Sequence, residues 1–102
     1  MANNIGITRT IISQLGGSGR LNAMLGAKDF LAHENGVSFK ITAKAKNKAN
    51  YIKIVLNGND LYDVTFGYIR GTNYTIRSEH TDIYAESLVS FIEDETDLFL
   101  SL

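Results

Sequence analysis

The sequence predicts an α+β domain with two short N-terminal helices, a four-stranded antiparallel meander and a C-terminal helix packed on one face. The central observation is Tyr51–Arg70, where apolar residues alternate on both sides of Asn57-Gly58-Asn59-Asp60, the pattern of a β-hairpin. Apolar residues at helical spacing flank this segment on both sides. At 102 residues and 44% hydrophobic content, residues 1–102 are expected to form one domain around one core.

The N-terminal quarter predicts two short helices. The first is expected from Thr8 to the stop at Gly16-Gly17, and the second over residues 19–25. Residues before Thr8 are expected to be loosely held, and Phe30-Leu31 to anchor a link that ends in a turn at 34–36. The apolar residues at helical spacing are Ile11, Ile12, Leu15, Leu21, Met24 and Leu25.

Four strands are expected to follow. The first covers Val37–Ala43, and a polar loop at Ala43–Asn50 joins it to the hairpin. A turn at Gly71-Thr72 then leads into a short fourth strand. Because side chains alternate across a strand, one face collects the apolar residues. The side chains expected to face inward are Val37, Phe39, Ile41, Ile52, Ile54, Leu56, Tyr62, Val64, Phe66, Tyr68, Tyr74 and Ile76.

The last fifth of the chain predicts an amphipathic helix that begins near Thr81 or Asp82, either of which is a suitable N-cap. Its apolar stripe is expected to contain Tyr84, Leu88, Phe91 and Ile92. The five residues 98–102 include four large apolar side chains. This tail is expected either to dock into the core of its own chain or to join two copies in a homodimer.

Charge is distributed unevenly along the chain. Residues 1–57 carry eight Lys or Arg and two acids, a net charge of +6. Residues 58–102 carry two Lys or Arg and nine acids, a net charge of −7, so the whole chain has a net charge of −1. Such asymmetry predicts separate basic and acidic surfaces, one of which meets a charged partner, unless the halves pair with each other or are merely solvated. No apolar run approaches the length of a membrane span, so we expect a soluble cytoplasmic protein.

The sequence offers no catalytic signature. There is no cysteine, so thiolate metal sites and disulfides are excluded. The glycine-rich stretch Gly16–Arg20 lacks the Lys-Ser/Thr pair of a phosphate-binding loop, and His33 and His80 stand alone, short of the ligand set of a metal site. We therefore expect no enzyme activity, no cofactor and no metal.

The outward-facing residues suggest nucleic-acid binding. The expected open face combines cations, hydroxyl groups and one aromatic ring, next to the lysines of the polar loop. Surfaces of this kind bind single-stranded nucleic acid, because cations follow phosphates and rings stack on bases. Solvated strand residues explain the same pattern without a ligand. The candidate nucleic-acid-binding residues are Lys40, Lys44, Lys46, Lys48, Tyr51, Lys53 and Arg77.

The acidic residues suggest the alternative of a protein partner. They gather on or beside the C-terminal helix, where an acidic ridge can dock on a basic protein surface, although a solvated helix face explains them equally. The candidate protein-binding residues are Glu86, Glu93 and Asp94.

The runs ISQLGG, NAMLGAKDF, YIKIVLNGNDLYDVTFGYIRG and TDLFLSL, in this order, resemble a family of small proteins encoded by bacteriophages and prophages. The resemblance covers residues 12–102, and its motifs are structural. It implies a phage origin and a location in the host cytoplasm, and it names no activity. Four strands followed by a helix are also similar in topology to the Whirly and positive-cofactor single-strand binders, an analogy at the level of fold alone.

Overall fold

The computed structural model of the protein describes residues 5–98. Three helices and five strands make up this part of the chain, together with a single 3-10 turn. The helices are α1 (Ile5–Gln14), α2 (Ser18–Leu25) and α3 (Leu88–Thr96), with the 3-10 turn at Ala85–Ser87. The strands are β1 (Lys28–His33), β2 (Gly36–Lys40), β3 (Tyr51–Leu56), β4 (Tyr62–Arg70) and β5 (Asn73–Ile83).

The α+β class is confirmed, and the sheet is an antiparallel meander in the order β1-β2-β3-β4-β5. The expected count of four strands is wrong, because the segment around Phe30-Leu31 forms the edge strand β1 and not a link. The register of β1 against β2 shifts between Lys28 and Leu31, and Asp29 takes a φ of 54°. This irregularity removes the period-2 pattern by which a strand is recognised.

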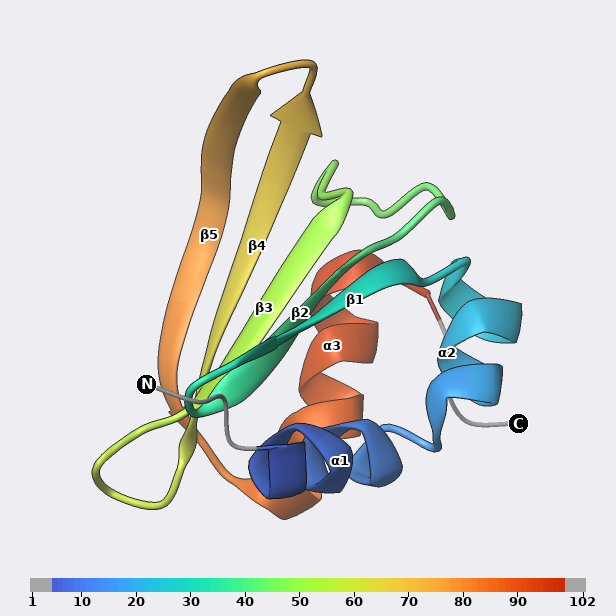
Figure 1. Cartoon of the computed structure of the whole chain (residues 1–102). Coiled ribbons are helices and arrows are strands. Elements are labelled where there is room, and N and C mark those ends of the chain that lie inside the picture. The colour runs from blue at the N-terminus through green and yellow to red at the C-terminus, as the bar shows by residue number, and fades with distance from the viewer. Residues whose placement is uncertain (1–4, 99–102) are drawn as a thin grey trace.

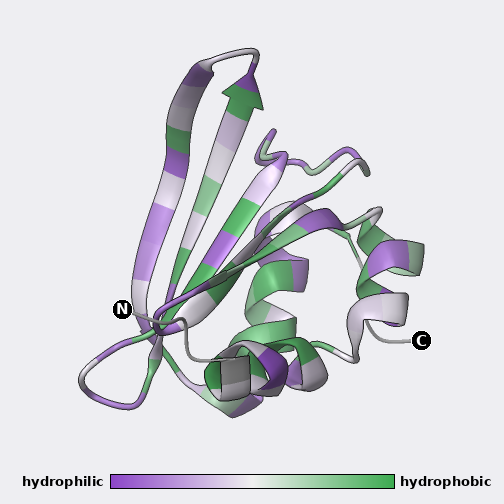
Figure 2. Ribbon diagram, viewed as in Figure 1, coloured by the Kyte–Doolittle hydropathy of each residue, from purple (hydrophilic) through white to green (hydrophobic). Residues whose placement is uncertain are grey.

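One core fills the space between the sheet and the helices, which lie together on one side of it (Figure 1). Ile52 and Ile54 on β3 are fully buried, with Lys53 between them on the other face. Figure 2 shows the same alternation as green and purple bands along β3. From the helical layer, the fully buried apolar side chains are Ile11, Leu15 (the residue after α1), Leu21, Leu25, Leu88 and Ile92.

The β3–β4 hairpin forms as predicted, with Leu56 opposite Tyr62. Its loop is not a tight two-residue Asn-Gly turn, and the residue at positive φ is Asp60, at 59°. The Asn57 side chain organises the loop by accepting the backbone N–H of Asn59 at 2.8 Å and that of Leu61 at 3.2 Å. These side-chain hydrogen bonds form an Asx turn, which closes the loop without a glycine at positive φ.

The final strand is longer than predicted and faces the other way at its start. Tyr74 and Ile76 were expected in the core, yet each is 49% exposed. The two-residue turn places Arg70 opposite Asn73, so Tyr74 lies opposite Ile69 on the open face. A turn of this length fixes the register whatever the hydrophobicity of the residues that follow.

The helix start near Thr81 or Asp82 is also wrong. β5 continues to Ile83, which pairs with Tyr62, and Asp82 sits in a register irregularity at a φ of 58°. The apolar stripe of α3 retains Leu88, Phe91 and Ile92, but Tyr84 precedes the helix and is 59% exposed.

Two further expectations concern the first and the last residues of the chain. Helix α1 already includes residues 5–7, which were expected to be loose. Leu98 is partly buried against the core, while residues 99–102 of the apolar tail lie outside the described residues, so the predicted homodimer contact stays a prediction. Among residues 5–98, no helix has the length and apolar character needed to cross a bilayer.

Candidate nucleic-acid interface

The upper ends of β4 and β5 project beyond the helices (Figure 1). We call this projection, residues 67–77, the arm. Most of its β5 half is exposed. The β5 half of the arm is therefore open to a ligand, whereas on β4 Gly67 is buried and Tyr68 and Ile69 are half-buried.

The loop 41–50 is hydrogen-bonded to the C-terminal ends of two helices, α2 and α3. The backbone N–H groups of Thr42 and Ala43 donate to the Leu25 carbonyl at the end of α2, and the Lys46 N–H donates to the Thr96 carbonyl at the end of α3 at 2.9 Å. In the sequence AKAKNKAN the alanines pack inward, Ala45 and Ala49 being buried. The lysines between them are therefore directed outward.

A hollow of about 540 Å³ lies between this loop and the inner face of the arm. Ile41, Ala45 and Ala49 give it an apolar floor, and four exposed cations surround it. Its full lining is Ile41, Thr42, Ala43, Lys44, Ala45, Lys48, Ala49, Asn50, Tyr68, Arg70 and Arg77. We call this site the basic hollow. No acid lines it, and within residues 5–98 none of its cations is in an ion pair.

A β-bulge directs Arg77 into the basic hollow. β5 skips one residue between the pairs Phe66–Ser78 and Gly67–Ile76, and Arg77 is the extra residue. Its guanidinium carbon lies 5.2 Å from the centre of the Tyr68 ring, within the range of a cation–π contact. The bulge thus turns Arg77 from the expected open face to the opposite face, where it joins the lysines of the loop.

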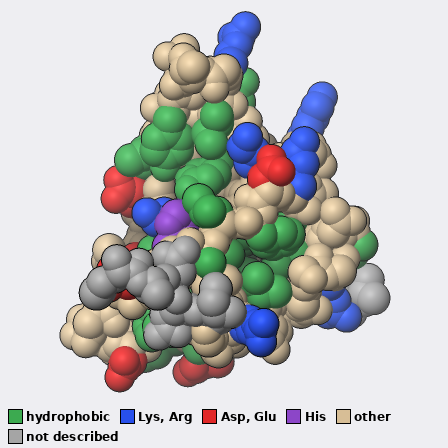
Figure 3. All heavy atoms as spheres, viewed as in Figure 1, with side chains coloured by type: hydrophobic (Ala, Val, Ile, Leu, Met, Phe, Trp, Pro, Cys, Tyr) green, Lys and Arg blue, Asp and Glu red, His purple; other side chains and the backbone are tan. Residues whose placement is uncertain are grey.

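The open face is less basic than predicted. Lys40, Tyr51 and Lys53 lie on it, as their register across β2 and β3 requires, but the Lys40 ammonium is 3.7 Å from the Asp29 carboxylate. Figure 3 shows hydrophobic, basic and acidic side chains mixed on the face in view. Phosphate binding is therefore better supported at the basic hollow than across this face.

Beside Lys53 on the open face, His33 Nε2 lies 2.7 Å from the Ser38 hydroxyl oxygen. Burial lowers the pKa of His33 from its usual 6.5, and the charge of Lys53 lowers it further. The imidazole is therefore neutral at neutral pH and adds no positive charge to this face.

Two tyrosines form an aromatic site on the open face. The rings of Tyr51 and Tyr74 meet edge to face with centres 5.6 Å apart, and Tyr74 lies over Gly67, whose missing Cβ leaves room for the ring. Burial raises the pKa of the Tyr74 hydroxyl, and Tyr51 and Glu79 raise it further. The Tyr74 ring is therefore neutral at neutral pH and presents a face suited to stacking.

The structure therefore divides the predicted nucleic-acid-binding residues into two groups. Lys44, Lys48 and Arg77 line the basic hollow, whereas Lys40, Tyr51 and Lys53 belong to the open face. Lys46 is exposed and lines neither site.

Sequence reasoning missed three residues of these sites. Arg70 and Tyr68 line the basic hollow, and Tyr74 completes the aromatic pair. The available signal was the two-residue turn at Gly71-Thr72, which places Tyr74 on the face of Ile69.

The predicted acidic ridge is divided as well. Glu86 lies in the 3-10 turn, while Glu93 and Asp94 are on α3. Glu86 and Asp94 are exposed and Glu93 is half-buried. The neighbouring Glu95 has a carboxylate oxygen 2.8 Å from His80 Nε2 on β5, so part of the acidic charge joins the helix to the sheet.

In the part of the chain that the structure describes, no three His, Cys, Asp or Glu residues gather as metal ligands would. No family model, curated protein or solved structure matches the chain.

Proposed function

We propose that this chain is a small non-enzymatic protein that binds single-stranded nucleic acid at the projecting end of its sheet. The observation that supports this function is the basic hollow, where Lys44, Lys48, Arg70 and Arg77 line one cavity without an acid among them. A volume of about 540 Å³ falls within the range of ligand sites that hold a group of nucleotide size. The phage origin and the host cytoplasm as its place of action rest on the resemblance of residues 12–102.

The four cations favour a phosphate ligand over a neutral one. Arginine binds phosphate through two parallel N–H donors, and lysine contributes a mobile point charge. The floor of Ile41, Ala45 and Ala49 is apolar, so it suits the flat body of a base or sugar and adds no polar group that would need a partner.

Fluorescence anisotropy with a labelled oligothymidine tests the function. We expect binding at low salt that weakens steeply as salt is added, since each phosphate contact on a single strand contributes about −0.7 to the log–log slope. If each arginine contributes about 0.7 kcal/mol, within the range of exposed ion pairs, the double variant Arg70→Ala/Arg77→Ala binds about tenfold more weakly.

The matched control is Arg9→Ala/Arg20→Ala, which removes the same charge from two exposed arginines of α1 and α2 that do not line the basic hollow. We expect this variant to bind as the unaltered protein does. The proposal is wrong if the unaltered protein binds no oligonucleotide at low salt, or if the two double variants lose affinity equally.

A second candidate is a phage accessory protein that binds or inhibits a host protein. The exposed, apolar Tyr74 and Ile76 on the open face favour it, because clustered exposed apolar groups mark docking sites. Reversal of Glu86, Glu93 and Asp94 to lysine tests whether the acidic side is used instead. Capture of a host protein that is lost in Ile76→Ser and kept in the acid-reversal variant would assign docking to the open face.

A further inference from the structure

Two more hollows continue from the basic hollow toward the open face. The first, of about 320 Å³, shares Ile41, Thr42 and Asn50 with the basic hollow. Because these three residues line both cavities, they form a saddle between them. The full lining of this second hollow is Lys28, Lys40, Ile41, Thr42, Asn50, Ile69 and Gly71.

The last hollow lies on the open face and has a volume of about 230 Å³. It is lined by Tyr51, Lys53, Ile69 and Tyr74, and we call it the tyrosine hollow. It shares Ile69 with the second hollow. The three cavities therefore form one series that runs from the inner face of the arm, over the saddle, to the aromatic pair.

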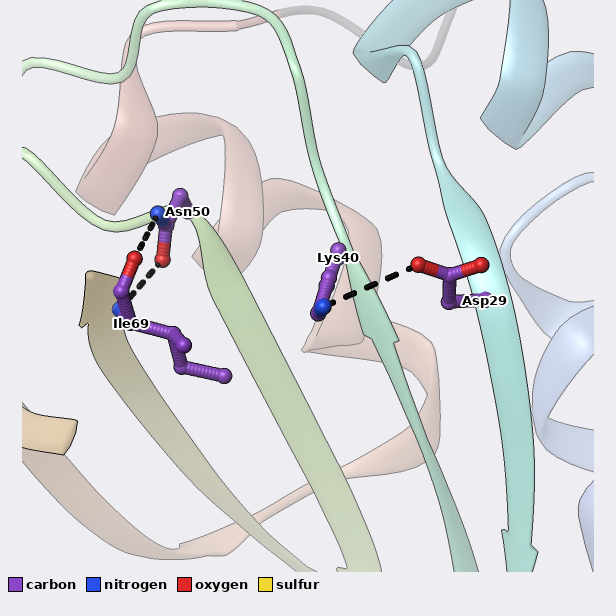
Figure 4. A network of polar contacts seen from close by, with 4 residues as sticks. All are labelled: Asp29, Lys40, Asn50 and Ile69. Carbon is purple, nitrogen blue, oxygen red and sulfur yellow. Dashed lines mark hydrogen bonds and ion pairs between the residues drawn. The ribbon is translucent and has the colours of Figure 1, made fainter. Parts of the chain in front are cut away.

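The saddle is held in place by Asn50. Its side-chain amide donates to the Ile69 carbonyl at 2.8 Å, and its side-chain oxygen accepts the Ile69 N–H at 2.7 Å (Figure 4). Its backbone carbonyl accepts the Ile41 N–H, and its backbone N–H donates to the Gly67 carbonyl. Bonds on both sides fix the spacing of the loop and the arm, so the passage between the cavities is preformed.

Cations accompany the whole series, and the aromatic rings come at its end. After the four cations of the basic hollow come Lys28 and Lys40 in the second hollow and Lys53 in the tyrosine hollow. The contact of Lys40 with Asp29 is exposed and 3.7 Å long, so it offers weak competition to an incoming phosphate.

We propose that a bound single strand wraps around the end of the sheet, with its phosphates following the basic hollow and the saddle and an unpaired base stacked in the tyrosine hollow. This inference rests on the proposed function and adds the path, the stacking residue and the reason for a preference for single strands. A duplex has a persistence length of about 150 base pairs, so bending it around one small domain carries an elastic cost that a flexible single strand does not have.

Strand length separates the two ends of the path. A dinucleotide, dT2, occupies the basic hollow alone, whereas dT12 is within the lengths that single-strand binders cover and reaches the tyrosine hollow. We expect Tyr74→Leu to weaken dT12 binding about 5- to 150-fold, the range for loss of one stacked base, and to leave dT2 binding unchanged. The double variant Arg70→Ala/Arg77→Ala weakens both ligands.

Matched controls exist for both kinds of contact. Tyr84→Leu removes another exposed tyrosine, one that lines none of the three hollows, and we expect it to bind dT12 normally. Lys40→Ala should reduce the salt slope for dT12 by about 0.7, while Lys46→Ala, which lines none of the hollows, should not. If Tyr74→Leu fails to fold, the salt slope of Lys40→Ala with dT12 tests the path instead.

Fluorescence gives an independent reading, because the chain contains five tyrosines and no tryptophan. Stacking of a base on Tyr74 should quench more tyrosine emission with dT12 than with dT2, which reaches only Tyr68 in the basic hollow, and Tyr74→Leu should remove the difference. A 12-base-pair duplex should bind more weakly than dT12, because bending it carries an elastic cost.

The possible results separate this inference from the proposed function. If dT12 binds and only the arginine variant weakens it, with Tyr74→Leu and Lys40→Ala unchanged, the path is wrong and the basic hollow stands alone. Equal affinity for the duplex and dT12 likewise overturns the wrapped strand. If no oligonucleotide binds the unaltered protein, both proposals are wrong.

Discussion

Replacement of Asn50 by alanine should destabilise the fold by an amount that the structure defines. The substitution removes two hydrogen bonds to Ile69, of 2.8 and 2.7 Å. Each such bond contributes about 0.5–1.5 kcal/mol net, so the expected loss in the free energy of unfolding is about 1–3 kcal/mol. Asn50 is half-buried, so water replaces part of the lost bonding and keeps the cost within this range.

Urea unfolding followed by circular dichroism measures this loss. With an m-value of about 1.5 kcal/mol/M, the midpoint should fall by about 0.7 to 2 M. Hydrogen exchange gives a local reading, because the Ile69 N–H loses its acceptor and should exchange faster. Asn73→Ala is the control within the same arm: Asn73 is exposed, its side chain makes no hydrogen bond within residues 5–98, and we expect a change below about 0.5 kcal/mol.

Two results would refute this reasoning. One is an unfolding free energy for Asn50→Ala within about 0.5 kcal/mol of the unaltered protein, below the lower bound for two lost bonds. The other is unchanged protection of the Ile69 amide, which would mean that another group already bonds it.

Further predictions concern pH and two glycines. Burial and Lys53 lower the pKa of His33 in the folded state, so the unfolded chain binds the proton more readily; stability present above pH 6.5 should be lost as pH falls from 6.5 toward the folded pKa. His33→Gln should reduce this loss in urea titrations at pH 7 and pH 5, and identical pH dependence in both proteins would contradict the assignment. In Gly36→Ala the new Cβ would overlap the Ile54 carbonyl oxygen, which should cost about 3 kcal/mol or prevent folding. Gly58→Ala, with nothing within 4 Å, should keep its melting temperature, and equal melting of the two glycine variants would refute the steric argument.

The sequence by itself determined the class of fold and the central hairpin. Alternation around Ile52, Ile54 and Val64 predicted three buried side chains correctly, because a strand with one covered face must repeat every second residue. The hairpin followed from the polar residues Asn57–Asp60 between the two runs, while the folded loop also includes Leu61 and pairs Leu56 with Tyr62. These are local signals, and they do not depend on what the rest of the chain does.

The register of the outer strands was decided by tertiary structure. β1 carries adjacent Phe30 and Leu31 and a backbone irregularity at Asp29, and it becomes a strand because β2 offers it a hydrogen-bonding edge. Tyr74 looks like a core residue by hydrophobicity, yet its pairing with Ile69 holds it on the open face. Hydrogen-bonded register outweighs the preference of one ring for burial, since a slip would reverse every side chain of the strand.

At the candidate site, too, the sequence predicted some features and the tertiary structure decided the others. The sequence identified the lysines of the loop 41–50 as exposed cations, and Lys44 and Lys48 do line the basic hollow. Their meeting with Arg70 and Arg77 requires the bulge in β5 and the docking of the loop on the ends of α2 and α3. Periodicity describes neighbours along a strand or helix, whereas a binding site joins residues brought together by long-range pairing, and only the folded chain supplies that.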